Sequence, residues 1–354
     1  MEDIKLILVL KSKKLFMFLF ILLFCCFIFT FCMIKTSSAK VKSQKLEENN
    51  YIKWVDFNIT YDAMNTALKL DIDSHNKETA IRYNWIEILA YLGTKYGGTF
   101  KKYKNKDIDD LIKKLDSGAS IESITKNMKY YSYYFEVYNA ILGEFVGSYE
   151  IQVSDTDDSS LEFVEKYGLK VFSPIAKGYY YSHFDDFGQN RSYGYKRKHL
   201  GHDLMGSIGT PIIAIESGTI EELGWNQYGG WRIGIRSFDK KRYYYYAHLR
   251  KDYPYNKALS IGNSVNAGDV IGYLGRTGYS AIENTNNIND NHLHFGIQLI
   301  FDESQKEGSN EIWIDCYAIT KLLEKNKSKV IKIEGTKEYK RVYDFIDNPN
   351  RKGP

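Results

Sequence analysis

Residues 292–300 read His-Leu-His-Phe-Gly-Ile-Gln-Leu-Ile, so polar and apolar side chains alternate along this stretch. His292 and His294 fall on one side of an extended chain, and Leu293 and Phe295 fall on the other. A period of two is typical of a strand with one buried face. Two neighbouring imidazoles are unusual on a purely structural strand, because each ring nitrogen needs a hydrogen-bond partner. The pair indicates either a surface strand that happens to carry two histidines or a metal or catalytic site.

Near the start of the chain, residues 15–34 form an apolar run of twenty residues without a charge. At a rise of about 1.5 Å per residue, a helix of this length spans a bilayer core about 30 Å thick. We therefore expect a transmembrane helix or signal anchor over residues 15–34, after a cytoplasmic N-terminus of residues 1–14. A cleaved signal peptide is the alternative, because residues 37–39 are small, although the apolar run is longer than a usual signal-peptide core. Both interpretations place the remainder outside the cytoplasmic membrane, anchored in the first case and secreted in the second.

The cysteine content and the net charge exclude two classes of protein. Three of the four cysteines lie inside the apolar run, which leaves Cys316 alone in the rest of the chain. This excludes a disulfide within that part and a Cys-rich zinc module. The net charge is only +4 and is spread over many acidic and basic residues, so we expect no nucleic-acid partner.

The spacing of apolar residues changes along the chain. Residues 35–55 are charged and lack an apolar period, which is typical of a linker. Within residues 56–150, apolar residues recur at helical spacing over residues 81–96, 108–115 and 124–142. This region is predicted to be a small all-α module, and its role does not follow from the sequence.

Residues 165–325 have a different character, with short apolar runs separated by turns and glycines. Such a pattern leaves no room for crossover helices and predicts an all-β domain. Residues 326–354 are predicted to form a charged C-terminal tail. The expected fold class is therefore α+β: a transmembrane helix, a small all-α module and then an all-β domain.

Two more groups of polar residues lie in the predicted β domain. His199 and Asp203 are four residues apart, and the glycines around them favour strand and loop over helix. Tyr246 and His248 alternate along a predicted strand and should share one of its faces. Two imidazoles and a carboxylate leave the fourth position of Zn²⁺ open for water, as in a catalytic site, whereas structural zinc sites are closed by four protein ligands. Two further histidines outside the coordination sphere would supply proton transfer.

Three short motifs follow one another in the predicted β domain: His-x-Gly-x-Asp at residues 199–203, Tyr-x-His-Leu at residues 246–249 and His-Leu-His-Phe at residues 292–295. A glycine-rich segment, residues 262–278, lies between the last two. Together these motifs resemble the lysostaphin/LytM-type zinc metalloendopeptidases, over about residues 172–323. The resemblance is specific, because several separate motifs agree. It implies a LytM-type peptidase domain with the duplicated-hybrid-motif fold.

The resemblance also implies roles for five residues. His199, Asp203 and His294 match the zinc ligands of the family, with one Zn²⁺ ion per catalytic domain. His248 and His292 match its two catalytic histidines. By resemblance, these two histidines activate or orient the attacking water and stabilise the tetrahedral intermediate.

Three further residues carry weaker expectations. Tyr246 is a candidate substrate contact near the oxyanion, with packing on its strand as the alternative. Asn284 lies in a long polar loop and is a candidate substrate contact, with a solvated loop as the alternative. Arg191 ends a Phe-Gly-x-x-Arg segment that resembles the family's Phe-Gly-x-Arg but contains one extra residue, which leaves its role open.

The function implied by the resemblance is a zinc-dependent endopeptidase that hydrolyses cross-links or stem peptides of bacterial peptidoglycan. Its partners would be peptidoglycan and, through the N-terminal helix, the membrane. The alternative is a catalytically silent or weakly active scaffold or activator, such as a component of a sporulation or secretion channel. Every ligand position of the family is filled in this sequence, which favours the enzyme.

Overall fold

The chain is described here by a computed structural model, which covers residues 51–77, 81–154, 161–193, 195–306, 308 and 310–347. The expected membrane segment, residues 15–34, lies outside the described residues. Among the helices that the structure describes, none is both long and apolar enough to cross a membrane. The described residues from Ile52 onward form one compact unit.

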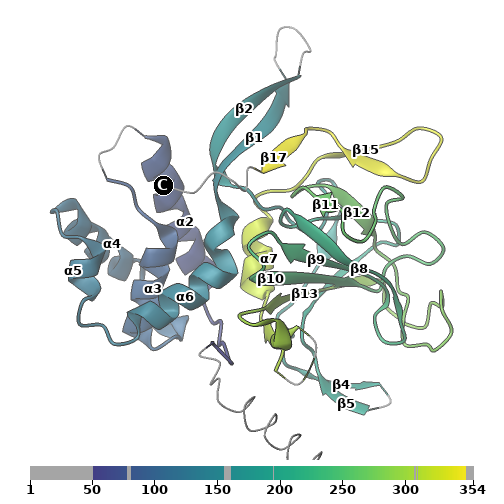
Figure 1. Cartoon of the computed structure of the whole chain (residues 1–354), viewed down its shortest axis with the longest axis horizontal. Coiled ribbons are helices and arrows are strands. Elements are labelled where there is room, and N and C mark those ends of the chain that lie inside the picture. Colours follow the sequence, from purple (N-terminus) through teal and green to yellow (C-terminus); the bar gives the residue numbers. More distant parts are fainter. Residues whose placement is uncertain are drawn as a thin grey trace, which may run out of the picture. The chain divides into compact units, whose positions relative to one another are not determined.

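Helices make up the first part of the described chain (Figure 1). Asn84 begins helix α3 by accepting hydrogen bonds from the backbone N–H groups of Ile86 and Glu87, and Gly97 ends it in the left-handed conformation. Trp85 and Leu89 lie on the buried face of this helix. The helical elements are α2 (Tyr61–Asn76), α3 (Trp85–Tyr96), η1 (Phe100–Lys102), α4 (Asn105–Asp116), α5 (Ile121–Thr125), α6 (Tyr131–Leu142) and η2 (Gly143–Phe145).

The segment predicted as one helix over residues 124–142 is divided between α5 and α6. Two backbone hydrogen bonds of the i to i+3 type, from Met128 N to Thr125 O and from Tyr131 N to Met128 O, turn the chain between the two helices. Asn127 lies at this turn, where a short polar side chain is favoured over a helix interior.

The second part of the chain is built around an eight-stranded antiparallel sheet (Figure 1). Strand β13 (His292–Leu299) lies between β10 (Arg242–Ala247) and β6 (His202–Gly206). The other strands of this sheet are β3 (Tyr181–Ser182), β8 (Gly218–Asn226), β9 (Gly230–Ser237), β11 (Ser264–Val265) and β14 (Ile312–Ile314). Smaller antiparallel pairs are formed by β7 (Pro211–Ile213) with β12 (Val270–Tyr273) and by β4 (Asn190–Tyr193) with β5 (Tyr195–Lys198).

The alternation predicted for residues 292–299 is confirmed by the structure. Leu293, Phe295 and Ile297 are completely buried on one face of β13. His292 and His294 lie on the opposite face, because side chains alternate along a strand. The sheet thus carries the two histidines on a rigid, well-packed element.

Residues assigned from the sequence to a charged tail (326–354) contribute strands to the fold. Strands β15 (Val330–Lys332) and β16 (Tyr339–Arg341) pair with each other, after the short helix α7 (Tyr317–Leu323). Strand β17 (Phe345–Asp347) pairs with β1 (Val146–Ser154), which forms a hairpin with β2 (Leu161–Leu169). The last described strand is therefore hydrogen-bonded to the β1–β2 hairpin, which directly follows the helices.

A buried arginine joins the helices to the large sheet. Arg242, at the start of β10, is fully buried, and its Nε and Nη2 donate to the Glu216 carboxylate at 2.8 and 3.0 Å. Its Nη1 donates to the carbonyl oxygen of Ala140 in α6 at 2.5 Å. Since a fixed guanidinium satisfies both a buried carboxylate and a helix carbonyl, one side chain holds β10 against α6.

Replacing this arginine tests its contribution to stability. We expect Arg242→Ala to lower the free energy of unfolding by about 3–5 kcal/mol, because the Glu216 carboxylate is left buried without a cationic partner and keeps only the hydrogen bond from the Tyr244 hydroxyl. The matched control is Lys241→Ala, at an exposed neighbouring position, which should change stability by about 0.5 kcal/mol or less. Denaturant titration of both variants measures the difference. Equal transition midpoints for the two variants would contradict this account of the buried pair.

Candidate active site

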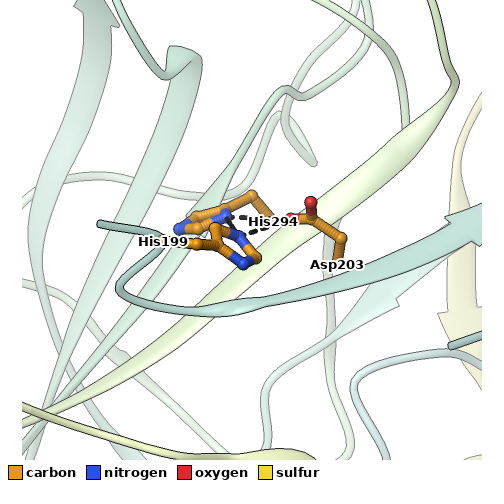
Figure 2. A group of neighbouring side chains, drawn as sticks. All are labelled: His199, Asp203 and His294. Carbon is orange, nitrogen blue, oxygen red and sulfur yellow. Dashed lines mark hydrogen bonds and ion pairs between the residues drawn. The ribbon is translucent and has the colours of Figure 1, made fainter. Parts of the chain in front are cut away.

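Three side chains from separate elements converge at one point (Figure 2). His199 Nε2 lies 3.0 Å from Asp203 Oδ1 and 3.0 Å from His294 Nδ1. His294 Nδ1 lies 3.0 Å from Asp203 Oδ1. The two nitrogens and the oxygen therefore form a nearly equilateral triangle of donor atoms.

The register of the sheet brings two of these residues together. His294 on β13 pairs directly with Asp203 on β6, so both side chains lie on the same face. His199 lies in the connection just before β6, held by backbone hydrogen bonds to Gly188 and Gln189. A Cβ atom at Gly201 would lie 2.5 Å from the His294 ring. Only glycine fits at that position, which explains the glycine of the His-x-Gly-x-Asp motif.

The donor set suits a divalent zinc ion. Two imidazole nitrogens and one carboxylate oxygen are the ligands of many catalytic zinc sites, in which Zn–N and Zn–O distances are about 2.0–2.2 Å. His199 Nδ1 lies 3.1 Å from Asp186 Oδ2 and so has an acceptor for its proton. When Nδ1 carries the proton, Nε2 presents a lone pair to the triangle, as a metal ligand requires.

The charges at the triangle favour a bound cation. Burial alone would raise the pKa of Asp203, but the contacts with His199 and His294 outweigh it and hold this pKa well below its ordinary range. Burial lowers the pKa of His199, yet the hydrogen bonds with Asp186 and Asp203 raise it to about 9. Since a metal-binding imidazole has to give up this proton, metal binding is linked to proton release.

The other two predicted histidines lie beside the triangle. The ring centroids of His248 and His292 are 4.8 Å apart, and those of His248 and His294 are 5.8 Å apart. His248 Nδ1 lies 2.9 Å from the carbonyl oxygen of Thr277, which can only accept, so Nε2 is left unprotonated in the neutral ring. Burial holds the pKa of His248 well below its ordinary value, so the ring is neutral near pH 7.

All five histidine and aspartate residues line one cavity of about 610 Å³: His199, Asp203, His248, His292 and His294. A second cavity of about 610 Å³ shares Tyr245 and His294 with it. This second cavity continues over the open face of the large sheet as far as Tyr243 and Gln298. The two cavities together form one groove beside the triangle.

Tyr246 does not reach this groove. Its side chain is fully buried, its ring packs against Phe295, and its hydroxyl accepts from the backbone N–H of Ile215 at 3.1 Å. The structure therefore places Tyr246 in the core, in agreement with the alternative that it packs on its strand. The neighbouring Tyr245 lines the groove instead. The prediction that Tyr246 and His248 share a face is wrong, because His248 has a φ of 62° and this left-handed backbone reverses the alternation at the end of β10.

Asn284 also lies away from the residues that line the groove. Its side-chain oxygen accepts from Trp231 Nε1 and from the Asp252 backbone N–H, both at 2.9 Å. Its amide nitrogen donates to the Asp252 carboxylate at 2.5 Å. These bonds fix the loop that contains Asn284, so its side chain has a structural role there.

Two residues contact the triangle from behind: Arg191, whose role the sequence left open, and Asp186, to which no sequence motif pointed. Arg191 Nη2 donates to Asp203 Oδ2 at 3.0 Å and also pairs with the Asp186 carboxylate. Asp186 in turn contacts His199. Asp186 directly precedes the Phe-Gly segment that ends at Arg191, so the segment with one extra residue lies against the candidate metal ligands.

Comparison with known proteins places this site in a family. Residues 197–307 match Peptidase family M23. The L-Ala–D-Glu endopeptidase of Bacillus subtilis is 38% identical over 117 residues, which cover 33% of this chain and 34% of that protein. This chain therefore spans about a third of the length of that relative.

Two solved structures are similar to this chain in sequence. The catalytic domain of the antimicrobial peptidase lysostaphin from Staphylococcus simulans is 34% identical, with 40% of this chain and 92% of that chain covered and a TM-score of 0.32. The lytM protein of Ruminococcus gnavus is 27% identical, with 76% and 89% covered and a TM-score of 0.47. Residues 197–307, which contain the motifs, therefore form a domain of peptidase family M23 that is homologous to lysostaphin and the LytM-type endopeptidases.

Proposed function

We propose that this chain is a zinc-dependent endopeptidase that hydrolyses peptide bonds in bacterial peptidoglycan. The triangle of His199, Asp203 and His294, with two more histidines beside it in one groove, supports this function best. The family that matches residues 197–307 is a peptidase family. The groove is open along a face of the large sheet, where an extended peptide can lie.

In this proposal His199, Asp203 and His294 hold the ion. When bound, zinc supplies a Lewis acid that polarises a carbonyl oxygen and makes water more acidic. His248 contributes its Nε2, which is free to accept a proton because Nδ1 faces the Thr277 carbonyl. His292 Nδ1 faces the Asp290 carbonyl oxygen at 2.9 Å in the same way, so both rings present Nε2 as the reactive nitrogen.

We further infer that the enzyme acts outside the cytoplasmic membrane. Peptidoglycan lies there, and the apolar run at residues 15–34 has the composition of an export or anchor segment. The stem peptides and cross-links of the wall are exposed to a domain on that side. The bond that is cleaved depends on the groove residues rather than on the triangle.

The proposal is tested on purified sacculi. We expect the full chain with Zn²⁺ to release soluble peptides, which mass spectrometry would identify together with the bond cleaved. The variant His294→Ala removes one of three ligands and should retain no zinc and release no more peptide than wild-type protein treated with a chelator. Intact sacculi after incubation with zinc-loaded wild-type protein would contradict the proposal and favour a scaffold.

A second variant separates catalysis from metal binding. His248→Ala leaves the three ligand atoms in place, so we expect zinc content near that of the wild type. The rate of peptide release should fall by about 10²–10⁴-fold, because a general acid–base group is lost. Zinc content by atomic absorption and peptide release would be measured on the same preparation. An unchanged rate would rule out the catalytic role of His248.

A further inference from the structure

Asp186 is a buried carboxylate behind the triangle, and only 1% of its surface is exposed. Its Oδ2 lies 3.1 Å from His199 Nδ1 and also accepts from Arg191. Its Oδ1 has no hydrogen-bond partner within the described part of the chain. His202 Nδ1 lies 3.9 Å from this Oδ1 and also has no hydrogen-bond partner within the described residues.

This arrangement is unfavourable for folding by itself. A buried carboxylate oxygen without a hydrogen bond raises the free energy of the folded state by about 1–3 kcal/mol. An apolar side chain would fill the same space without that penalty. The position of Asp186 therefore suits a role at the metal centre better than a role in stability.

Arg191 competes with Asp186 as the hydrogen-bond partner of His199 Nδ1. Its Nη2 lies 3.3 Å from His199 Nδ1 and 3.0 Å from Asp203 Oδ2. A guanidinium only donates hydrogen bonds. Without the Asp186 carboxylate, the acceptor left at His199 Nδ1 is the Asp186 backbone carbonyl oxygen at 3.3 Å. Arg191 at the same distance could then compete with it by donating to Nδ1, and the proton of the neutral ring would lie on Nε2. In that tautomer Nε2 has no lone pair for a metal ion.

We propose that Asp186 is a positioning residue of the metal centre, which holds the proton of His199 on Nδ1 and so presents Nε2 to the ion. The inference rests on the proposed zinc site. Arg191 completes the arrangement, because it compensates the charge of Asp186 and binds Oδ2 of Asp203, which leaves Oδ1 of Asp203 to the triangle. Asp186 thus acts on the ion through His199 and does not touch substrate.

The test measures zinc affinity of the full chain rather than activity. Wild-type protein, Asp186→Ala, Asp186→Asn and Asp185→Asn are titrated with Zn²⁺ at pH 7 against a chelator of known affinity. We expect Asp186→Ala to weaken zinc binding by about 10–100-fold, as is typical when a carboxylate behind a ligating histidine is removed. Asp186→Asn keeps an acceptor oxygen without the charge and should lie between Asp186→Ala and the wild type.

Asp185→Asn is the matched control, because it makes the same chemical change at the exposed neighbouring residue. It should bind zinc within about twofold of the wild type, since exposed side chains away from a site change little. The absorption spectrum of the Co²⁺-substituted proteins gives a second readout. We expect it to change for both Asp186 variants, because the orientation of the His199 ligand changes, and to remain that of the wild type for Asp185→Asn.

Two outcomes overturn the inference in different ways. If the wild type binds zinc and digests sacculi while Asp186→Ala, folded by circular dichroism, binds zinc equally well, the positioning role alone is excluded. If Asp186→Ala does not fold, Asp186→Asn decides the question by the same comparison. If the wild type binds no zinc at all, both the proposed function and the role of Asp186 are excluded.

Discussion

The hydrogen-bonded pairing of β13 with β6 is the contact on which the site depends. It places His294 opposite Asp203, although the two residues are 91 positions apart in the sequence. A slip of this pairing by one residue would turn His294 into the core and Leu293 or Phe295 into the groove. The apolar face of β13 prevents such a slip, because Leu293, Phe295 and Ile297 are fully buried. Packing on one face of β13 therefore fixes the positions of His292 and His294 on the other face.

The backbone at the end of β10 is strained, and the strain serves the site. His248 has a φ of 62°, which is uncommon for a residue with a side chain. Its backbone N–H donates to Gly229 O at 2.8 Å, and its ring is bonded to Thr277 O. Together these bonds hold His248 against its conformational preference, as is common for functional residues. The ring thereby reaches the face that carries His294, which a regular continuation of the strand would not allow.

Sequence patterns predicted those structural features that are determined by residues close together in the chain. The period of two predicted the buried face of β13, and the resemblance to the lysostaphin/LytM-type family implied which histidines and aspartate meet. The pattern failed for Tyr246, because alternation was assumed to continue through the left-handed residue His248. No pattern pointed to Asp186 or to the contact of Arg242 with Ala140, since both depend on loops and elements brought together only by the fold.

The helices stabilise the same strand that ends at the candidate site. Strand β10 begins at the buried Arg242, which is bonded to Glu216 and to α6, and it leads within a few residues to His248. Along its length it is hydrogen-bonded to β9 on one side and to β13 on the other. A strand held at its start and on both edges has little freedom at its end, so the strained turn at His248 is supported by rigid structure. The helical residues therefore support the site from a distance, by fixing one end of a strand whose other end holds the histidine.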